Sequence, residues 1–211
     1  MTKVKICGIT NIEDAMSAFD SGADQIGLNF YSKSVRYVSP DKARQLVELL
    51  PKRLETVGVF VNETIEAVLA TAAQVGLDGI QLHGDEDPRY VHDLTKQTDR
   101  FIIKAFRVLP SFKVEDALDW KVTHQLFDTY SPSDRGGTGE TFDWKAIAVD
   151  MHECFPVSAY LAGGLTPDNL AEAVGIVRPY AVDVASGVES SPGKKDHRKV
   201  ASFIKAAKEA I

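Results

Sequence analysis

Two side chains suited to acid–base chemistry stand at the ends of apolar runs in this sequence: Cys7, in Lys5-Ile-Cys-Gly, and Asp128, in Gln125-Leu-Phe-Asp-Thr. A thiol, whose pKa is ordinarily near ~8.5, becomes a base at neutral pH when a helix N-terminus or a cation lowers that pKa. A carboxyl group that follows apolar residues is partly desolvated, and desolvation raises a carboxyl pKa as a general acid requires. Each residue also has a structural interpretation, as a small buried hydrophobe for Cys7 and as a loop-bonding side chain for Asp128.

Two glycine turns follow apolar runs late in the chain, within residues 157–169 and 181–193. In each, we expect a strand, a glycine turn and then a helix. Gly163, Gly164 and Gly187 carry no Cβ, so backbone N–H groups beside them and beside Ser186 can approach a ligand closely. Clustered N–H groups at a helix N-terminus bind anions. Tight turns alone would also use glycine, but two such junctions in succession favour a phosphate site.

Other polar residues at run ends are weaker candidates. Arg36 offers a planar fork that matches a carboxylate, although most arginines are solvated surface residues. His83, in Gln81-Leu-His-Gly, could be a base, a substrate contact or a structural histidine. Asn62 and Arg107 carry less weight still, and we interpret Cys154, late in a predicted helix, as structural.

The elements that must position these residues alternate between apolar runs and helical patterns. The sequence indicates helix starts at Asn11, Ser39-Pro40, Asn62, Thr166-Pro167 and Asp196. It also predicts a short fifth helix over Val114–Trp120. Eight strand–helix pairs fit a closed (β/α)8 TIM barrel better than an open sheet, so we expect α/β architecture with residues 1–211 as one catalytic domain. The expected strands are Val4–Ile9, Gln25–Phe30, Thr56–Val61, Gly79–Leu82, Phe101–Phe106, Gln125–Thr129, Val157–Ala162 and Ala181–Ala185.

Composition narrows the function. A net charge of −6 disfavours nucleic acid and anionic membranes as partners but permits a small phosphorylated ligand. Two widely separated cysteines, no signal peptide and no long apolar run predict a cytoplasmic protein. The glycine-rich loop 131–142 follows Asp128; it is either a lid that excludes water or a surface loop, and its place beside Asp128 favours the lid.

Seven short motifs in order make the chain resemble the phosphoribosylanthranilate isomerase family over essentially its whole length. They are Lys5-Ile-Cys-Gly-Ile-Thr, Gly58-Val-Phe-Val-Asn, Gln81-Leu-His-Gly, Phe127-Asp-Thr, Gly136-Gly-Thr-Gly-Glu-Thr-Phe-Asp-Trp, Leu161-Ala-Gly-Gly-Leu and Asp183-Val-Ala-Ser-Gly-Val-Glu. The resemblance implies a (β/α)8 barrel that carries out an Amadori rearrangement in tryptophan biosynthesis, with no metal or other cofactor. Our default expectation for the oligomeric state is a monomer.

The resemblance also implies residue roles. Asp128 would be the general acid and Cys7 the general base, while Arg36 would hold the anthranilate carboxylate. Backbone groups around Gly163, Gly164, Ser186 and Gly187 would hold the phosphate, and His83 and Asp183 would complete the substrate-binding set.

Three alternatives remain open. A related isomerase acting on the aminoaldose of histidine biosynthesis typically uses two aspartates, whereas the first strand here ends in Cys7. A synthase similar to indoleglycerol-phosphate synthase would need a lysine acid and a glutamate base at strand ends, and neither stands there. A non-catalytic phosphate-binding barrel would bind tightly without turnover.

Overall fold

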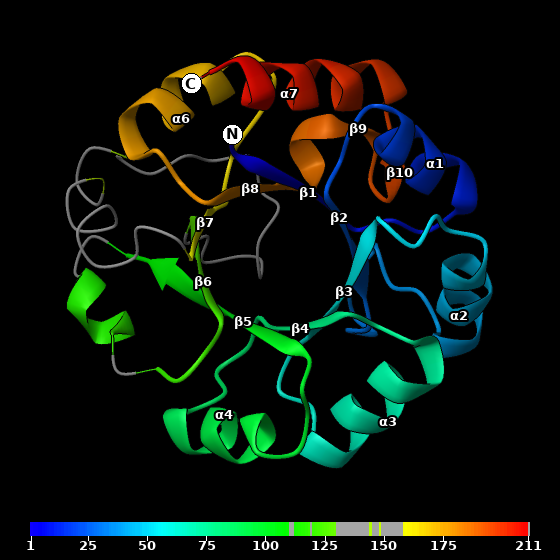
Figure 1. The fold of residues 1–211 in the computed structure, drawn as a ribbon, viewed down its shortest axis with the longest axis vertical. Coiled ribbons are helices and arrows are strands. Elements are labelled where there is room, and N and C mark those ends of the chain that lie inside the picture. The colour runs from blue at the N-terminus through cyan, green and yellow to red at the C-terminus, as the bar shows by residue number, and fades with distance from the viewer. Residues whose placement is uncertain (110–111, 119, 130–143, 145–147, 149–157, 211) are drawn as a thin grey trace.

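The computed structural model describes residues 1–109, 112–118, 120–129, 144, 148 and 158–210. Its centre is a closed barrel of eight parallel strands in chain order, as predicted, with helices on the outside (Figure 1). The strands are β1 Lys3–Cys7, β2 Gln25–Asn29, β3 Glu55–Phe60, β4 Gly79–Leu82, β5 Phe101–Val108, β6 His124–Thr129, β7 Ala159–Leu161 and β8 Ala181–Val184. The ring closes where Val4 of β1 pairs with Val182 of β8.

The helices follow from local capping signals. Asn11, Ser39 and Asp196 cap α1, α2 and α7 through their side chains, as their sequence positions indicate. Two starts were predicted too early: Thr64, not Asn62, caps α3, and α6 begins only at Leu170. The helices are α1 Ile12–Asp20, α2 Pro40–Glu48, α3 Ile65–Val75, α4 Pro88–Thr95, α6 Leu170–Val177 and α7 His197–Glu209, and the expected fifth helix is a 3₁₀ turn, η1 Val114–Ala117.

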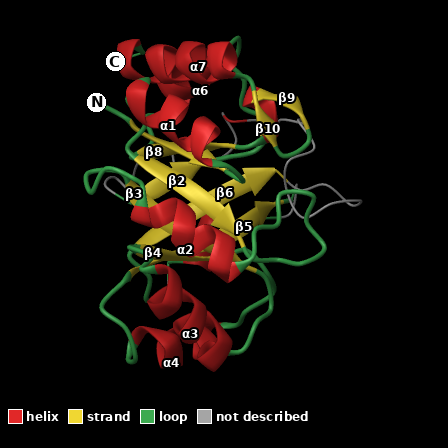
Figure 2. Ribbon diagram, turned by 90° about the vertical axis from the view of Figure 1, so that its right-hand side faces the viewer, coloured by secondary structure: helices red, strands yellow, loops and turns green. Residues whose placement is uncertain are grey.

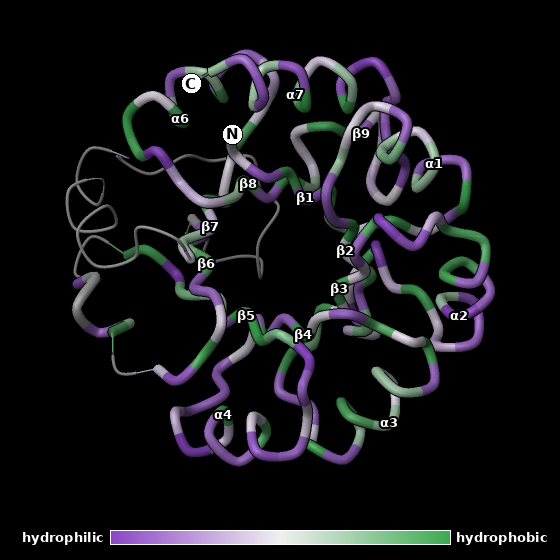
Figure 3. Tube along the Cα trace, viewed as in Figure 1, coloured by the Kyte–Doolittle hydropathy of each residue, from purple (hydrophilic) through white to green (hydrophobic). Residues whose placement is uncertain are grey.

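Side-chain alternation along the strands separates two cores. Successive strand residues point to opposite faces, so in β1 Val4 and Ile6 pack under the helices while Lys5 and Cys7 point into the barrel. A smaller cluster inside the barrel includes Leu126 and Tyr160. Apolar and polar residues accordingly alternate along the trace (Figure 3). Because Asp128 shares the face of Leu126, β6 also delivers its carboxyl group to the inside of the barrel mouth.

The helix after the second glycine turn is capped by Asp196, as predicted, but the connection before it holds elements that were not predicted. The chain forms a 3₁₀ turn, η2 Ser186–Val188, and a small antiparallel hairpin, β9 Glu189–Ser191 with β10 Lys194–Lys195, before α7 begins. The hairpin lies at the side of the barrel to which strands β5 and β6 point (Figure 2). Gly193, with φ +79°, occupies its tip, where the left-handed backbone favours glycine.

Candidate active site

One pocket at the carboxyl ends of the strands gathers all nine residues predicted to form the site. They are Cys7, Arg36, His83, Asp128, Gly163, Gly164, Asp183, Ser186 and Gly187. Asn62 and Arg107, the weakest candidates, are not part of its lining and instead contact Asp85 outside the pocket. Cys154 and the loop 131–142 lie outside the described residues, so their predicted roles stay predictions.

Cys7 sits beside a buried ion pair. Lys5, fully buried two residues earlier, donates from Nζ to Asp183 Oδ1 at 2.8 Å. A Cβ on Gly27 would lie 2.7 Å from Cys7 Sγ and 3.1 Å from Lys5 Nζ, so the thiol and the ammonium group occupy the same side of that glycine. The strand register Cys7–Gly27 therefore leaves room for both groups only because residue 27 has no side chain.

The pKa of the Cys7 thiol is raised, opposite to the direction that the sequence suggested. Burial is the main cause, and the negative charge of Asp183 acts in the same sense. The charge of Lys5 and its hydrogen bond to the thiol, with the charge of Lys195, lower the pKa but do not outweigh burial. Cys7 is consequently a thiol in most molecules at neutral pH.

Asp128 is held by a chain of two side chains. Its carboxyl group is nearly buried, and Oδ2 lies 3.2 Å from Nε2 of His83. Nδ1 of His83 lies 2.8 Å from the amide nitrogen of Gln81, which donates to it. Because the amide nitrogen of Gln81 can only donate, Nδ1 of His83 accepts, and Nε2 is the ring nitrogen that faces Asp128. Gln81 and His83 thereby fix the orientation of the carboxyl group, a role for Gln81 that sequence reasoning missed.

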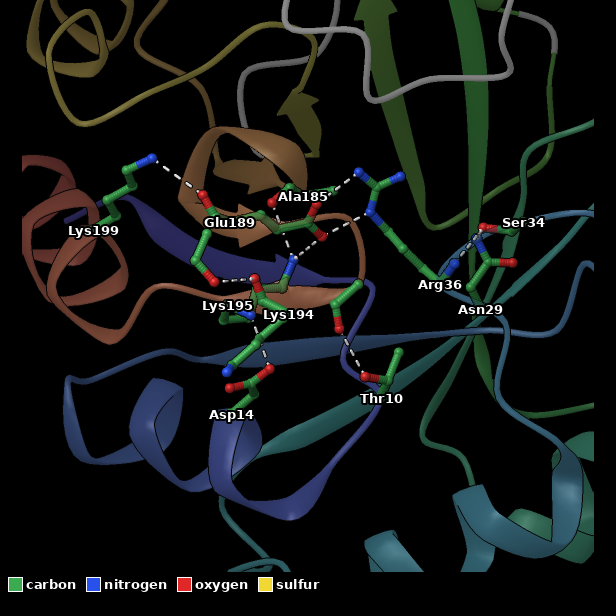
Figure 4. A network of polar contacts seen from close by, with 12 residues as sticks. Thr10, Asp14, Asn29, Ser34, Arg36, Ala185, Glu189, Lys194, Lys195 and Lys199 are labelled. Atoms are coloured by element: carbon green, nitrogen blue, oxygen red, sulfur yellow. Dashed lines mark hydrogen bonds and ion pairs between the residues drawn. The ribbon is translucent and has the colours of Figure 1, made fainter.

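The guanidinium group of Arg36 reaches the pocket from the loop after β2. Glu189, in β9, accepts from Nε and from Nη2 of Arg36 at 2.8 Å each. The same carboxylate accepts from Lys195 Nζ at 3.0 Å (Figure 4). A cation is thus fixed at one side of the pocket, where it can meet an anionic group of a ligand.

The two glycine turns also line the pocket. Gly163 and Gly164 have φ of +86° and +62°, a conformation that side chains other than glycine rarely adopt. Within the described part of the chain, neither of their N–H groups has a hydrogen-bond partner in the protein. Asn169 stabilises the turn by donating to the carbonyl of Gly164 and accepting from Thr166 N–H. The turn therefore presents unpaired donors suited to a phosphate.

Gly187 holds the two turns close together, which gives a first testable prediction. A Cβ there would lie 1.9 Å from the carbonyl oxygen of Leu165, so Gly187→Ala must push the turns apart. We expect KM for a phosphorylated substrate to rise on the order of tenfold. The matched control is Gly175→Ala in α6, where a Cβ meets nothing within 4 Å and KM should not change. An unaltered KM in Gly187→Ala would contradict the phosphate assignment.

Four residues of the site escaped sequence reasoning: Lys5, Gln81, Glu189 and Lys195. Lys5 carried a usable signal, because a lysine between Val4 and Ile6 in an apolar run must find a buried partner. Glu189 and Lys195 carried none, since their contacts depend on a hairpin that the sequence did not predict. In the described residues no group of three or more His, Cys, Asp or Glu side chains is arranged to hold a metal ion. Nor is any helix there long and apolar enough to cross a membrane.

The closed (β/α)8 barrel with a polar pocket at the carboxyl ends of its strands places this chain in the class of (β/α)8-barrel enzymes, whose active sites lie at that end. The family model of N-(5′-phosphoribosyl)anthranilate isomerase matches residues 4–206. The chain therefore belongs to the N-(5′-phosphoribosyl)anthranilate isomerase family, the isomerases of tryptophan biosynthesis, as its motifs predicted.

Relatives cover the chain from end to end. The N-(5′-phosphoribosyl)anthranilate isomerase of Trichlorobacter lovleyi is 47% identical over 211 residues, all of both chains. That of Thermotoga neapolitana is 48% identical over 208 residues, 99% of each chain. The crystal structure of the Thermotoga maritima enzyme superposes with a TM-score of 0.91 at 45% identity and covers 99% of both chains. The barrel prediction is confirmed.

Proposed function

We propose that this chain isomerises N-(5′-phosphoribosyl)anthranilate to 1-(2-carboxyphenylamino)-1-deoxyribulose 5-phosphate, with Asp128 as general acid, Cys7 as general base and residues 1–211 as one catalytic barrel. The observation that carries the proposal is the arrangement of the pocket. Cys7 and Asp128 enter it from β1 and β6, and Arg36 and the two glycine turns line the same pocket. The substrate has the matching groups: a carboxylate at one end, a phosphate at the other and the reacting carbons between them.

The reaction needs one proton donor and one proton acceptor. Asp128 protonates the furanose ring oxygen, the bond from that oxygen to C1′ breaks, and the aryl nitrogen becomes a protonated imine. Cys7 in its thiolate form removes the proton from C2′, and the electron pair moves into the imine to give an enolamine. Transfer of the hydroxyl proton from C2′ and protonation of C1′ yield the ketone. The imine is itself the electron sink, so this route needs no metal or redox cofactor.

Binding and orientation come from the sides of the pocket. Arg36 pairs with the anthranilate carboxylate, and N–H groups at Gly163, Gly164, Ser186 and Gly187 donate to the phosphate oxygens. His83 supports Asp128, and Asp183 balances the charge of Lys5 at the base of the pocket. A related structure supports a ligand of this kind: a phosphoribosylanthranilate isomerase 43% identical to this chain, with a TM-score of 0.87, was solved in complex with reduced 1-(o-carboxyphenylamino)-1-deoxyribulose 5-phosphate.

The raised thiol pKa of Cys7 predicts the pH dependence. A group with a raised pKa loses its proton only as the pH rises through that value, so the thiolate fraction increases with pH above neutrality. We expect alkylation of Cys7 by iodoacetamide, measured in a Cys154→Ser background, to accelerate on the order of tenfold per pH unit between about pH 7 and about pH 8.5. Turnover also needs the protonated form of Asp128, so kcat/KM should rise less steeply than alkylation over this range. An alkylation rate that is flat or falls over this range would contradict a raised thiol pKa at Cys7.

We also propose that the protein is cytoplasmic and that it is a monomer, our default expectation for its oligomeric state. The Thermotoga maritima enzyme, 44% identical with a TM-score of 0.87, has a structure described as monomers generated from a dimeric enzyme, so sedimentation of this chain is the relevant test.

Two substrates test the activity. The purified protein is mixed with freshly generated phosphoribosylanthranilate or with the aminoaldose of histidine biosynthesis, and the ketose product is identified by NMR. We expect turnover of the first. Turnover of the second alone, or tight binding of the first without turnover, would replace the proposal by one of its alternatives.

A further inference from the structure

The β9–β10 hairpin is fastened to neighbouring elements of the barrel wall. Thr10 Oγ1 donates to the carbonyl of Gly193 at the hairpin tip at 2.8 Å. Asp14 of α1 accepts from the backbone N–H of Lys195 at 2.9 Å. Lys199 of α7 donates to the carbonyl of Glu189 at 3.1 Å. Figure 4 shows these contacts around the hairpin. The hairpin is consequently a fixed support beside the pocket and not an isolated loop.

Both carboxylate oxygens of Glu189 are used within this support. The side chain is 5% exposed, and it binds the guanidinium group of Arg36 side-on while Lys195, itself fully buried, donates to Oε1. Burial would raise the pKa of Glu189, but the hydrogen bonds from Arg36 and the charge of Lys195 lower it, so the carboxylate is ionised at neutral pH. Removing the charge would leave the buried Lys195 and the half-buried Arg36 without their shared partner.

The stem of Arg36 is confined as well. A Cβ on Gly8 would lie 2.5 Å from Cδ of Arg36, so the aliphatic part of the side chain rests directly on that glycine. The backbone N–H of Arg36 donates to Ser34 Oγ at 3.1 Å. At the hairpin tip, a Cβ on Gly193 would lie 3.1 Å from the carbonyl oxygen of Val35. The hairpin thus contacts the Arg36 loop at two places, the tip and Glu189.

We propose that Glu189 is a positioning residue that sets the plane and place of the Arg36 guanidinium group, so that the preference for a substrate bearing an aryl carboxylate depends on Glu189. The inference rests on the proposed function, because the ligand of Arg36 is the anthranilate carboxylate. A two-point contact to Nε and Nη2 fixes the guanidinium plane, which a flexible arginine would otherwise sample freely. Recognition of a planar carboxylate requires that plane to be correct.

Two substrates and a matched pair of variants test this. Glu189→Gln is compared with Glu48→Gln, which alters another arginine-paired glutamate, one that is exposed on α2. Each is assayed with phosphoribosylanthranilate and with the aniline analogue that lacks the carboxylate. For Glu189→Gln we expect KM for the anthranilate substrate to rise on the order of tenfold, with kcat within about twofold, and kcat/KM for the aniline analogue to stay unchanged. Glu48→Gln should match the wild type with both.

The double variant Arg36→Met/Glu189→Gln separates positioning from a general loss of structure. If Glu189 acts through Arg36, the double variant has the same KM as Arg36→Met alone. Equal losses for both substrates, or losses that multiply in the double variant, would overturn the inference, as would an unchanged or lowered KM in Glu189→Gln. Should Glu189→Gln fail to fold, Glu189→Asp keeps the charge with a shorter reach and must show the same selective loss. If the wild-type protein does not turn over phosphoribosylanthranilate, the proposed function itself is overturned.

Discussion

Asp128→Asn is expected to remove turnover while leaving substrate binding nearly intact. The amide has the shape of the carboxyl group and its oxygen can still accept from His83 Nε2, which lies 3.2 Å from Oδ2 in the parent chain. It cannot supply the acidic proton that opens the furanose ring. A lost general acid costs on the order of 10²–10⁴ in kcat. Steady-state kinetics with phosphoribosylanthranilate, and calorimetric titration with a reduced product analogue, measure the two effects.

The control for this experiment is His83→Gln, which keeps a hydrogen-bond donor beside Asp128. It should lose less turnover than Asp128→Asn, because the acid itself remains. If Asp128→Asn instead binds the product analogue more than about tenfold more weakly, the residue serves in binding and its assignment as acid is wrong.

Cys7→Ser is expected to have the second large effect. Serine is close to cysteine in size, so the backbone of β1 should not change. A hydroxyl group, however, ionises far less readily than a thiol and is a much poorer base. We expect kcat to fall on the order of 10²–10⁴ with the affinity for the product analogue within about threefold. The pH-dependent alkylation by iodoacetamide, measured in a Cys154→Ser background, should also disappear, since the thiol that titrates is gone.

The matched control is Cys154→Ser, the same substitution at the other cysteine of the chain. It should leave kcat, KM and the pH profile at their wild-type values. Turnover near normal in Cys7→Ser would exclude Cys7 as the base and would direct attention to other titratable groups that face the pocket, such as His83 and Asp183.

The composition of the pocket could be predicted because barrel geometry gathers the ends of parallel strands. Once eight strands are identified, polar residues at their carboxyl ends must lie around one opening. Cys7, Asp128 and the glycine turns do so, although they are far apart in the sequence. The weaker candidates Asn62 and Arg107 also stand at strand ends but contact Asp85 outside the pocket, which depends on side-chain direction and not on position along the chain.

Two of the residues that the sequence did not reveal act through partners far away in the chain. Glu189 binds Arg36 across 153 positions, and Lys5 binds Asp183 across 178. No local pattern encodes such pairs. The predicted direction of the Cys7 pKa shift was wrong for a related reason. Nearby cations can be expected from the fold, but the burial of one sulfur atom depends on how β2 and β8 pack around it.

The most direct test of the account is consumption of freshly generated phosphoribosylanthranilate by the purified protein in buffer with EDTA, with Asp128→Asn measured in parallel. We expect the wild type to form 1-(2-carboxyphenylamino)-1-deoxyribulose 5-phosphate and the variant to form none above background. Equal rates for the two proteins, or a wild-type rate that EDTA abolishes, would contradict acid–base catalysis by Asp128 without a metal.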